Sequence, residues 1–257
     1  MSYQSMVITF LGTGTSCGVP QLGCVCSVCR SSDPRDRRMR SSVLVETKGK
    51  RILIDCGPDF YFQMLHRPFQ SFDAVLLTHS HYDHTGGLDD LRPFSKLQTV
   101  DVYADADTAK KILMRDAYCF SDTMKYRLPH LSMNEIKAHQ TFFIGDVKIT
   151  PIEVIHGKTP ILGYRIDDFV YITDMKTAAE SEIDYIKGAR LLVLNALRFK
   201  PHPTHQSLDE AIVFANKTGV SPVYFTHMSH EIGLHEETSK GLPPGMFLAY
   251  DGLTLKI

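Results

Sequence analysis

The chain contains the segment Thr78-His79-Ser80-His81-Tyr82-Asp83-His84-Thr85-Gly86-Gly87, and this stretch decides the fold that we expect for all 257 residues. Three imidazoles and one carboxylate lie within six residues, between an apolar run at 74–77 and a pair of glycines. The apolar run predicts a buried strand, and the glycines predict the start of a helix over 88–94. We therefore expect the polar side chains on a loop at the end of a sheet, where open α/β folds place their chemistry.

The spacing within this segment predicts two metal positions. His79 and His81 project to the same side of an extended chain, so both can hold one ion. Asp83 and His84 follow a change of chain direction, and we assign them to a second ion close to the first. The alternative is a histidine-rich surface loop, or imidazoles paired with carboxylates. Four ligand-type side chains directly behind a strand favour the metal site.

The pattern H-x-H-x-D-H in residues 79–84 resembles the signature of the metallo-β-lactamase superfamily. The resemblance implies an α/β fold of the metallo-β-lactamase type, which is a four-layer αβ/βα sandwich. In that superfamily an Asp-x-Gly turn supports the metal loop, and Asp55 and Gly57 match it. The resemblance does not define the substrate, because lactamases, thioesterases, lactonases, nucleases and phosphodiesterases share the fold.

Three residues in the second half of the chain extend the predicted site. His156 follows an apolar strand that we expect at 147–155, interrupted by a proline. Asp174 ends a strand expected at 169–173, and we interpret it as a carboxylate that bridges two ions rather than as a cap. The predicted set is His79, His81 and His156 for one ion, Asp83, His84 and His227 for the other, and Asp174 between them.

A second metal site is predicted from the cysteines. Six are present, and Cys24, Cys26 and Cys29 form a C-x-C-x-x-C cluster. Without a recognisable secretory signal, such a cluster is typical of metal binding rather than of disulfides. Three thiolates supply three of the four ligands of a tetrahedral zinc ion, the alternative being reduced thiols in a loop. We assign His230 as the fourth ligand, because it lies three residues after His227 and cannot easily face the same ion in an extended segment.

Composition and charge limit the classes of function. The formal net charge is −1, with 28 Lys and Arg against 29 Asp and Glu, whereas proteins that grip long nucleic acid usually have a basic excess. The basic cluster at 35–40 is expected to be solvated, the alternative being a contact with a substrate phosphate. No signal peptide is recognisable, and no apolar run approaches the ~20 residues of a membrane span. We expect one domain over residues 1–257, located in the cytoplasm, with a small substrate and no membrane partner.

Three local patterns predict structure around the site. The glycine-rich stretch at 12–18 predicts a loop whose backbone passes close to another group, for which the metal site is a candidate. A capping box at 207–210 predicts the start of a helix, which places His205 just before that helix. Residues 247–250 and 253–257 are expected to form a closing hairpin.

Three motifs occur in a defined order: G-C-x-C-x-x-C near the start, H-x-H-x-D-H in the middle and T-H-x-S-H at 226–230. Together they resemble the phosphodiesterases of bacterial phosphonate breakdown, which open phosphoribosyl 1,2-cyclic phosphate, and the likeness spans residues 7–252. The resemblance implies the same ligand sets, manganese or zinc in the catalytic pair, and a structural zinc at the cysteines. It also implies catalytic roles for Asp83 and for His205, the latter protonating the leaving oxygen; the alternative for His205 is an exposed loop imidazole.

Some features depart from that family, and rival functions share the fold. The stretch 195–198 lacks the acid that the family tends to carry, and 118–140 cannot be matched to it. The rivals are a lactonase or thioesterase, a tRNA 3′-end nuclease, and a non-catalytic protein of pyrroloquinoline quinone biosynthesis with a degraded metal motif. The intact H-x-H-x-D-H favours an enzyme. We predict a phosphodiesterase that hydrolyses a small cyclic or diester phosphate with a hydroxide bound to two divalent ions. For the oligomeric state, both a monomer and a homodimer are compatible with the sequence.

Overall fold

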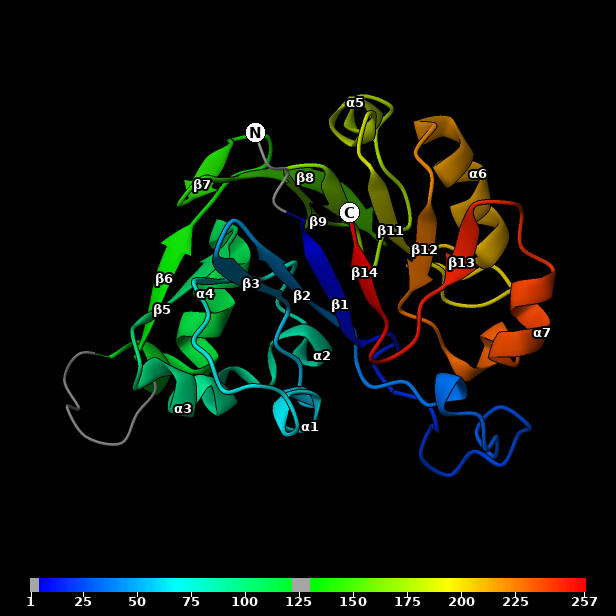
Figure 1. Ribbon diagram of the computed structural model, residues 1–257, viewed down its shortest axis with the longest axis horizontal. Helices are drawn as coiled ribbons and strands as arrows, with labels where there is room; N and C mark the ends of the chain where they lie inside the picture. Colours follow the sequence, from blue (N-terminus) through cyan, green and yellow to red (C-terminus); the bar gives the residue numbers. More distant parts are fainter. Residues whose placement is uncertain (1–4, 122–129) are drawn as a thin grey trace.

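Two β-sheets pack face to face in the computed structural model, which describes residues 5–121 and 130–257 (Figure 1). In spatial order, the described strands of the first sheet are β14 (Thr254–Lys256), β1 (Val7–Gly12), β2 (Ser42–Thr47), β3 (Lys50–Ile54), β4 (Ala74–Leu76), β5 (Val100–Ala104) and β6 (Leu131–Glu135). Those of the second sheet are β13 (Met246–Leu248), β12 (Val223–Thr226), β11 (Leu191–Asn195), β10 (Phe169–Tyr171), β9 (Thr159–Ile166), β8 (Val147–His156) and β7 (Phe142–Ile144).

Helices accompany both sheets and complete the four-layer αβ/βα sandwich expected from the sequence (Figure 1). Beside the first sheet lie α1 (Phe60–Met64), α2 (Tyr82–Thr85), α3 (Arg92–Ser95) and α4 (Ala106–Arg115), with the 3-10 turns η2 (Leu88–Leu91) and η3 (Ala117–Phe120). Beside the second lie α5 (Glu182–Ile186), α6 (Leu208–Thr218), α7 (His235–Lys240) and the turn η4 (His230–Ile232), while η1 (Pro34–Asp36) belongs to the long β1–β2 connection. None of the described helices has the length and apolar composition that a bilayer span requires.

Three apolar clusters hold the layers together. The central cluster takes buried residues from both sheets, among them Ile8 of β1 and Val193 of β11. A second cluster joins the first sheet to its helices through residues such as Phe60, and a third joins the second sheet to α6 through Leu208. The central strands are buried on both faces and therefore appear in the sequence as continuous apolar runs, as at 191–194.

Each sheet changes from antiparallel to parallel pairing along its width. Strands β1 to β3 and β7 to β10 pair antiparallel, whereas β3 to β6 and β10 to β13 pair in parallel. Parallel strands end at the same edge of a sheet, so the segments that follow them converge on one rim of the molecule. This rim is where the predicted metal ligands are found.

The prediction of a closing hairpin at 247–257 is wrong. Strand β13 pairs in parallel with β12 in the second sheet, whereas β14 pairs antiparallel with β1 in the first. The turn at 251–252 therefore carries the chain from one sheet to the other. A short turn between two apolar runs is compatible with either arrangement, because the local pattern does not define the partner strand.

Two other local expectations need correction. Strand β8 continues through Pro151 without interruption, because the last residue pair between β7 and β8 is at Ile149 and the proline lies beyond it. Asp83 and His84 lie on α2, a four-residue helix ahead of the glycine pair, and the helix expected at 88–94 is divided into η2 and α3.

The glycine-rich loop approaches other backbone segments. A Cβ atom on Gly12 would lie 2.0 Å from the carbonyl oxygen of Arg40, so no larger residue fits there. The backbone N–H of Met228 donates to the carbonyl of Thr13 at 2.9 Å, which attaches the loop to the residue after His227. The close approach expected at 12–18 therefore positions a predicted ligand through backbone bonds.

The basic cluster is only partly solvated. Arg38 is buried, and its guanidinium donates to Thr13 Oγ1 at 2.9 Å and to the carbonyl of Ala249 at 2.8 Å. Arg35 forms a partly exposed ion pair with Asp33 at 2.7 Å. The expectation of a solvated run holds for Arg35 and is wrong for Arg38, which links the glycine-rich loop to the end of the second sheet.

Candidate metal centre

All seven side chains predicted to hold the catalytic ions meet at the rim where the parallel strands end. Strand β4 leads to His79 and His81, helix α2 carries Asp83 and His84, and β8, β10 and β12 lead to the other three. The ligand atoms within 4.8 Å of one another form four overlapping groups, which are His79, His81 and His156; His79, His84 and Asp174; Asp83, His84 and His227; and His156, Asp174 and His205. The first and third groups are the two predicted sets, and Asp174 lies between them.

The first group presents ring nitrogens to a common point. His79 Nε2 and His81 Nδ1 are 2.9 Å apart, which corresponds to an angle of roughly 90° at an ion about 2.0–2.1 Å from both. His156 Nδ1 lies 2.9 Å from the carbonyl oxygens of Asp174 and Thr204, so it carries the proton and donates to them. Its Nε2 is then left unprotonated, which is the form that binds a metal.

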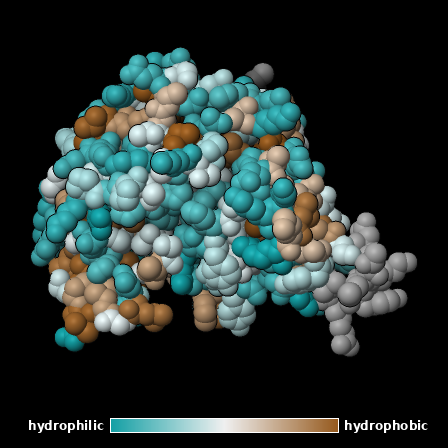
Figure 2. All heavy atoms as spheres, turned by 180° about the vertical axis from the view of Figure 1, so that it is seen from behind, coloured by the Kyte–Doolittle hydropathy of each residue, from teal (hydrophilic) through white to brown (hydrophobic). Residues whose placement is uncertain are grey.

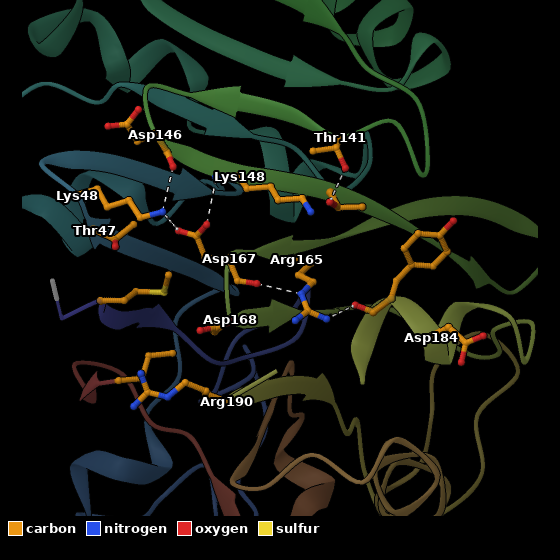
Figure 3. Close-up of a pocket in the computed structure, with 14 residues that line it drawn as sticks. Thr47, Lys48, Thr141, Asp146, Lys148, Arg165, Asp167, Asp168, Asp184 and Arg190 are labelled. Carbon is orange, nitrogen blue, oxygen red and sulfur yellow. Dashed lines mark hydrogen bonds and ion pairs between the residues drawn. The ribbon is translucent and has the colours of Figure 1, made fainter. Parts of the chain in front are cut away.

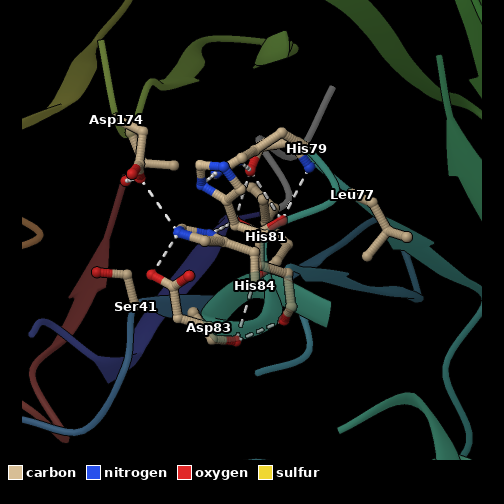
Figure 4. Close-up of polar contacts among 12 residues, drawn as sticks. Ser41, Leu77, His79, His81, Asp83, His84 and Asp174 are labelled. Atoms are coloured by element: carbon tan, nitrogen blue, oxygen red, sulfur yellow. Dashed lines mark hydrogen bonds and ion pairs between the residues drawn. The ribbon is translucent and has the colours of Figure 1, made fainter. Parts of the chain in front are cut away.

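The second group encloses a buried space between carboxylates and imidazoles. His84 Nε2 lies 3.2 Å from both Asp83 Oδ2 and Asp174 Oδ2 (Figure 4). His227 Nε2 lies 3.3 Å from Asp174 Oδ2 and 3.6 Å from Asp83 Oδ2. The ring nitrogens His84 Nε2 and His227 Nε2 are buried without a hydrogen-bond partner in the described chain. Buried polar atoms are normally paired, and a divalent ion between these four side chains would supply the missing partner, so the residues fit a metal.

Asp55 orients this group through hydrogen bonds. Its carboxylate accepts from His84 Nδ1 at 2.7 Å and from the backbone N–H of Thr78 at 2.8 Å. The Thr78 hydroxyl donates to the same carboxylate and lies 3.0 Å from His79 Nδ1. The buried carboxylate of Asp55 therefore determines which nitrogen of His84 carries the proton. It also contacts His79 indirectly, through the hydroxyl of Thr78. A Cβ atom on Gly57 would lie 2.0 Å from the carbonyl oxygen of Asp83, which explains the glycine of this turn.

Replacing Asp55 with asparagine should weaken binding of the ions by about 10–100-fold, because the amide cannot accept from both His84 and Thr78 in the same way. Inductively coupled plasma mass spectrometry after dialysis against graded chelator would measure the loss. Asp209→Asn on the exposed face of α6 is the matched control and should bind metal like the natural chain. Unchanged metal content in Asp55→Asn would contradict the positioning role of this acid.

The charges of the centre favour a cation. Burial disfavours the charged form of both Asp83 and Asp174, yet neighbouring imidazoles outweigh it and hold the pKa of each carboxyl below its usual range. Burial also opposes protonation of His84, but Asp83, Asp174 and Asp55 raise its pKa well above the ordinary value. Burial and the neighbouring His84 lower the pKa of His79. The carboxylates thus attract positive charge.

His205 lies beside this centre, just ahead of α6. The predicted capping box is present, with Ser207 and Glu210 bonding reciprocally, and it fixes the loop that carries His205. The side chain is 12% exposed, and its Nδ1 is 3.6 Å from Asp174 Oδ1. Its ring centroid is 5.0 Å from that of His227. Burial, followed by His227, lowers the pKa of His205 to about 3. The alternative of a solvent-exposed loop imidazole is therefore wrong.

The predicted cysteine site is also assembled. Cys24, Cys26, Cys29 and His230 place their ligand atoms within 4.8 Å of one another. His230 Nδ1 lies 3.3 Å from Cys26 Sγ and 3.5 Å from Cys24 Sγ, close to the roughly 3.6 Å expected between sulfur and nitrogen around a tetrahedral zinc. The Cys29 N–H and His230 lower the pKa of Cys26 to about 6, which favours the thiolate that zinc needs. Burial raises the pKa of the neighbouring Cys29 to about 11.

The cysteine loop forms a lobe at the same rim. Leu22 and Val25 at its tip are 96% and 65% exposed. Figure 2 shows apolar side chains at lower left, where this lobe lies in the reversed view, and a notch in the lower edge beside it. The loop therefore borders a hollow near the end of the parallel strands.

Several supporting residues escaped the sequence reasoning. Thr78 lies inside the opening segment, but only its contact with Asp55 reveals a role. Thr173 donates its hydroxyl to Asp174 Oδ2 at 2.8 Å, and Asn195 bonds the backbone of Met175. Each belongs to an apolar strand or its end, and no spacing in the sequence distinguishes these residues from others at strand ends.

A second hollow, of about 1040 Å³, lies near the other end of the strands. Charged residues that pair with one another line much of it (Figure 3). Lys48 Nζ is 2.9 Å from Asp167 Oδ2, and Arg165 donates to the carbonyl of Tyr185 at 3.0 Å. Among the described residues that line it, none is a histidine or a cysteine. This hollow is therefore not the metal centre.

Comparisons with known proteins place the chain in the beta-lactamase superfamily. A model of the beta-lactamase superfamily domain matches residues 50–228. The crystal structure of a diphosphatase from the PhnP family is similar with a TM-score of 0.92 and 41% sequence identity, over 98% of this chain and 97% of that one. Ribonuclease Z of Methanopyrus kandleri is 25% identical over 306 residues, which cover 99% of each protein. The octanoyltransferase of Porphyromonas gingivalis is 45% identical over 95% of this chain, which spans 50% of the length of that relative.

Proposed function

The chain belongs to the metallo-β-lactamase superfamily, and within it to the PhnP family, and from this premise we propose that it is a metal-dependent phosphodiesterase for a small cyclic or diester phosphate. The chain is a hydrolase by its family, and the fold implies divalent metal ions. The proposal adds the bond that is cleaved, the number of ions and the size of the substrate.

One observation carries the proposal. Among the described residues, His84 Nε2 is buried without a partner in hydrogen-bond geometry, although it lies 3.2 Å from an oxygen of Asp83 and 3.2 Å from an oxygen of Asp174. The separate group of His79, His81 and His156 lies on the other side of Asp174. This arrangement supports two neighbouring cation positions with one carboxylate between them, and enzymes that cleave phosphate esters use such pairs of ions.

We assign each side chain a role in this reaction. His79, His81 and His156 would hold one ion, Asp83, His84 and His227 the other, and Asp174 would lie between both. Bound there, two divalent ions would generate hydroxide from a shared water at neutral pH and neutralise charge that develops on the phosphate. Manganese and zinc both suit these ligands. The buried carboxylate of Asp83 could also accept a proton from the attacking water.

We propose His205 as the proton donor to the leaving oxygen. Its ring centroid lies 4.6 Å from that of His156 and 5.0 Å from that of His227, so it faces the same space as the two ligand sets. The low pKa of this ring in the metal-free protein disfavours the protonated form. A phosphate diester bound beside the ring brings negative charge, which favours protonation.

The charge balance supports a small substrate over a long nucleic acid. With a net charge of −1, the chain lacks the overall excess of basic residues that proteins usually have when they bind a long nucleic acid. The likeness to ribonuclease Z along 99% of both proteins nevertheless makes RNA 3′-end cleavage the second candidate.

The experiment that tests the proposal compares substrate classes on one preparation. Metal-stripped protein would be reconstituted separately with Mn²⁺ and Zn²⁺ and assayed on bis(p-nitrophenyl) phosphate, a lactone, a thioester and a precursor tRNA. We expect metal-dependent cleavage of the diester and no turnover of the lactone, the thioester or the RNA.

His66→Asn, an exposed histidine outside both metal groups, is the control and should retain full activity. A folded protein that retains its metals but does not cleave bis(p-nitrophenyl) phosphate would reject the proposal of a phosphodiesterase for small substrates. Cleavage of the precursor tRNA alone would favour the nuclease.

A further inference from the structure

Asn195 is a buried amide between two strand ends that carry predicted ligands. It is the last residue of β11 and is completely inaccessible to solvent. On one side it pairs with Thr226, the residue directly before His227. On the other side β11 runs parallel to β10 with Val193 opposite Tyr171, so the same register brings Asn195 level with Thr173, directly before Asp174.

The side chain of Asn195 closes a double hydrogen bond on one backbone residue. Its Oδ1 accepts from the N–H of Met175 at 2.8 Å, and its Nδ2 donates to the carbonyl of Met175 at 3.0 Å. Met175 directly follows Asp174. The backbone N–H of Gln206 donates to the same carbonyl at 2.9 Å, which attaches the loop of His205 to this point. Asn195 thus connects the segments that carry Asp174 and His205.

Asp174 adopts an uncommon backbone conformation that its neighbours hold in place. Its φ is +56°, in the left-handed region that residues with a Cβ rarely adopt. The Thr173 hydroxyl holds the carboxylate itself, donating to Asp174 Oδ2 at 2.8 Å. The two bonds to Met175 hold the backbone on the other side. We propose that Asn195 is a positioning residue that fixes the Asp174 carboxylate between the two ion positions; this inference rests on the metal role proposed for Asp174.

The amide of Asn195 satisfies both groups of Met175. The N–H of Met175 requires an acceptor, and its carbonyl requires a donor. An alanine at position 195 would remove the acceptor of this N–H and one of the two donors to this carbonyl. Asn195→Ala therefore removes both side-chain hydrogen bonds without adding charge, and this makes it the sharpest test.

We expect Asn195→Ala to raise the free Mn²⁺ concentration needed for half-loading of the catalytic pair by about 10–100-fold. Equilibrium dialysis followed by metal analysis measures this loading without any substrate. The zinc at Cys24, Cys26, Cys29 and His230 should remain at its natural content. Asn216→Ala on the exposed side of α6 is the matched control and should load like the natural chain. If Asn195→Ala does not fold, Asn195→Leu also removes both bonds while keeping a branched side chain, and it should show the same shift.

Natural Mn²⁺ loading in a folded variant at position 195 would overturn the inference. A lower melting temperature of the metal-free variant with unchanged Mn²⁺ loading would assign Asn195 to fold stability alone, and would overturn it as well. Because loading is measured in the absence of substrate, a negative phosphodiesterase assay would reject the proposed reaction without altering this result.

Discussion

Replacing Asp174 with alanine should reduce turnover by about 10³-fold or more. Its carboxylate is 2% exposed and lies between the two groups of predicted ligands, with Oδ2 3.2 Å from His84 Nε2 and 3.3 Å from His227 Nε2. Without it, the two proposed ion positions would lose the carboxylate that lies between them. Steady-state assay of the Mn²⁺-reconstituted variant on bis(p-nitrophenyl) phosphate measures the loss.

A second variant at this position separates chemistry from folding. Asn tolerates the left-handed backbone that Asp174 adopts, so Asp174→Asn should retain the fold while removing the negative charge. We expect it to lose nearly as much activity as the alanine variant, with a circular dichroism spectrum like that of the natural chain. Asp168→Ala, in the exposed turn between β9 and β10, is the control and should remain fully active. Retained activity in both Asp174 variants would count against the two-metal mechanism.

Replacing Cys26 with serine should remove one zinc ion per chain and lower the melting temperature by about 10 °C or more. The sulfur of Cys26 lies 3.3 Å from His230 Nδ1 and accepts from the Cys29 N–H, so it is central to the cysteine site. The site ties the loop at 23–29 to the segment after β12, and a small apolar cluster around Val19 and Val28, with Leu234 against it, supports the same contact. Metal analysis and differential scanning calorimetry on the same sample measure both effects.

The control for this prediction is Cys17→Ser, because Cys17 is an exposed cysteine outside the cluster. It should retain every metal and the natural melting temperature. Loss of the catalytic ions from Cys26→Ser with the third metal retained would contradict the assignment of the cysteines to a separate structural zinc.

The sequence by itself was sufficient to identify the fold and the residues that meet at the metal centre. The predicted ligands of the catalytic group come shortly after apolar runs in the sequence. His79, for example, follows the run at 74–77, and His227 follows the run at 223–226. Buried parallel strands are recognisable as continuous apolar runs, and their ends meet at one edge, so the local pattern already predicts that the side chains behind them converge. The capping box ahead of α6 is equally local, and it is confirmed.

Only the tertiary structure decided which strands pair and what holds the ligands in place. The apolar pattern at 247–257 could not show that β13 and β14 belong to different sheets, because a strand's own residues do not specify its partner. Asp55 bonds His84 across 29 positions of the chain, and Asn195 bonds Met175 across 20. Such contacts depend on sheet register and on the burial of polar groups far apart in sequence. A single sequence records local periodicity and spacing, whereas these hydrogen bonds exist only once distant strands have packed together.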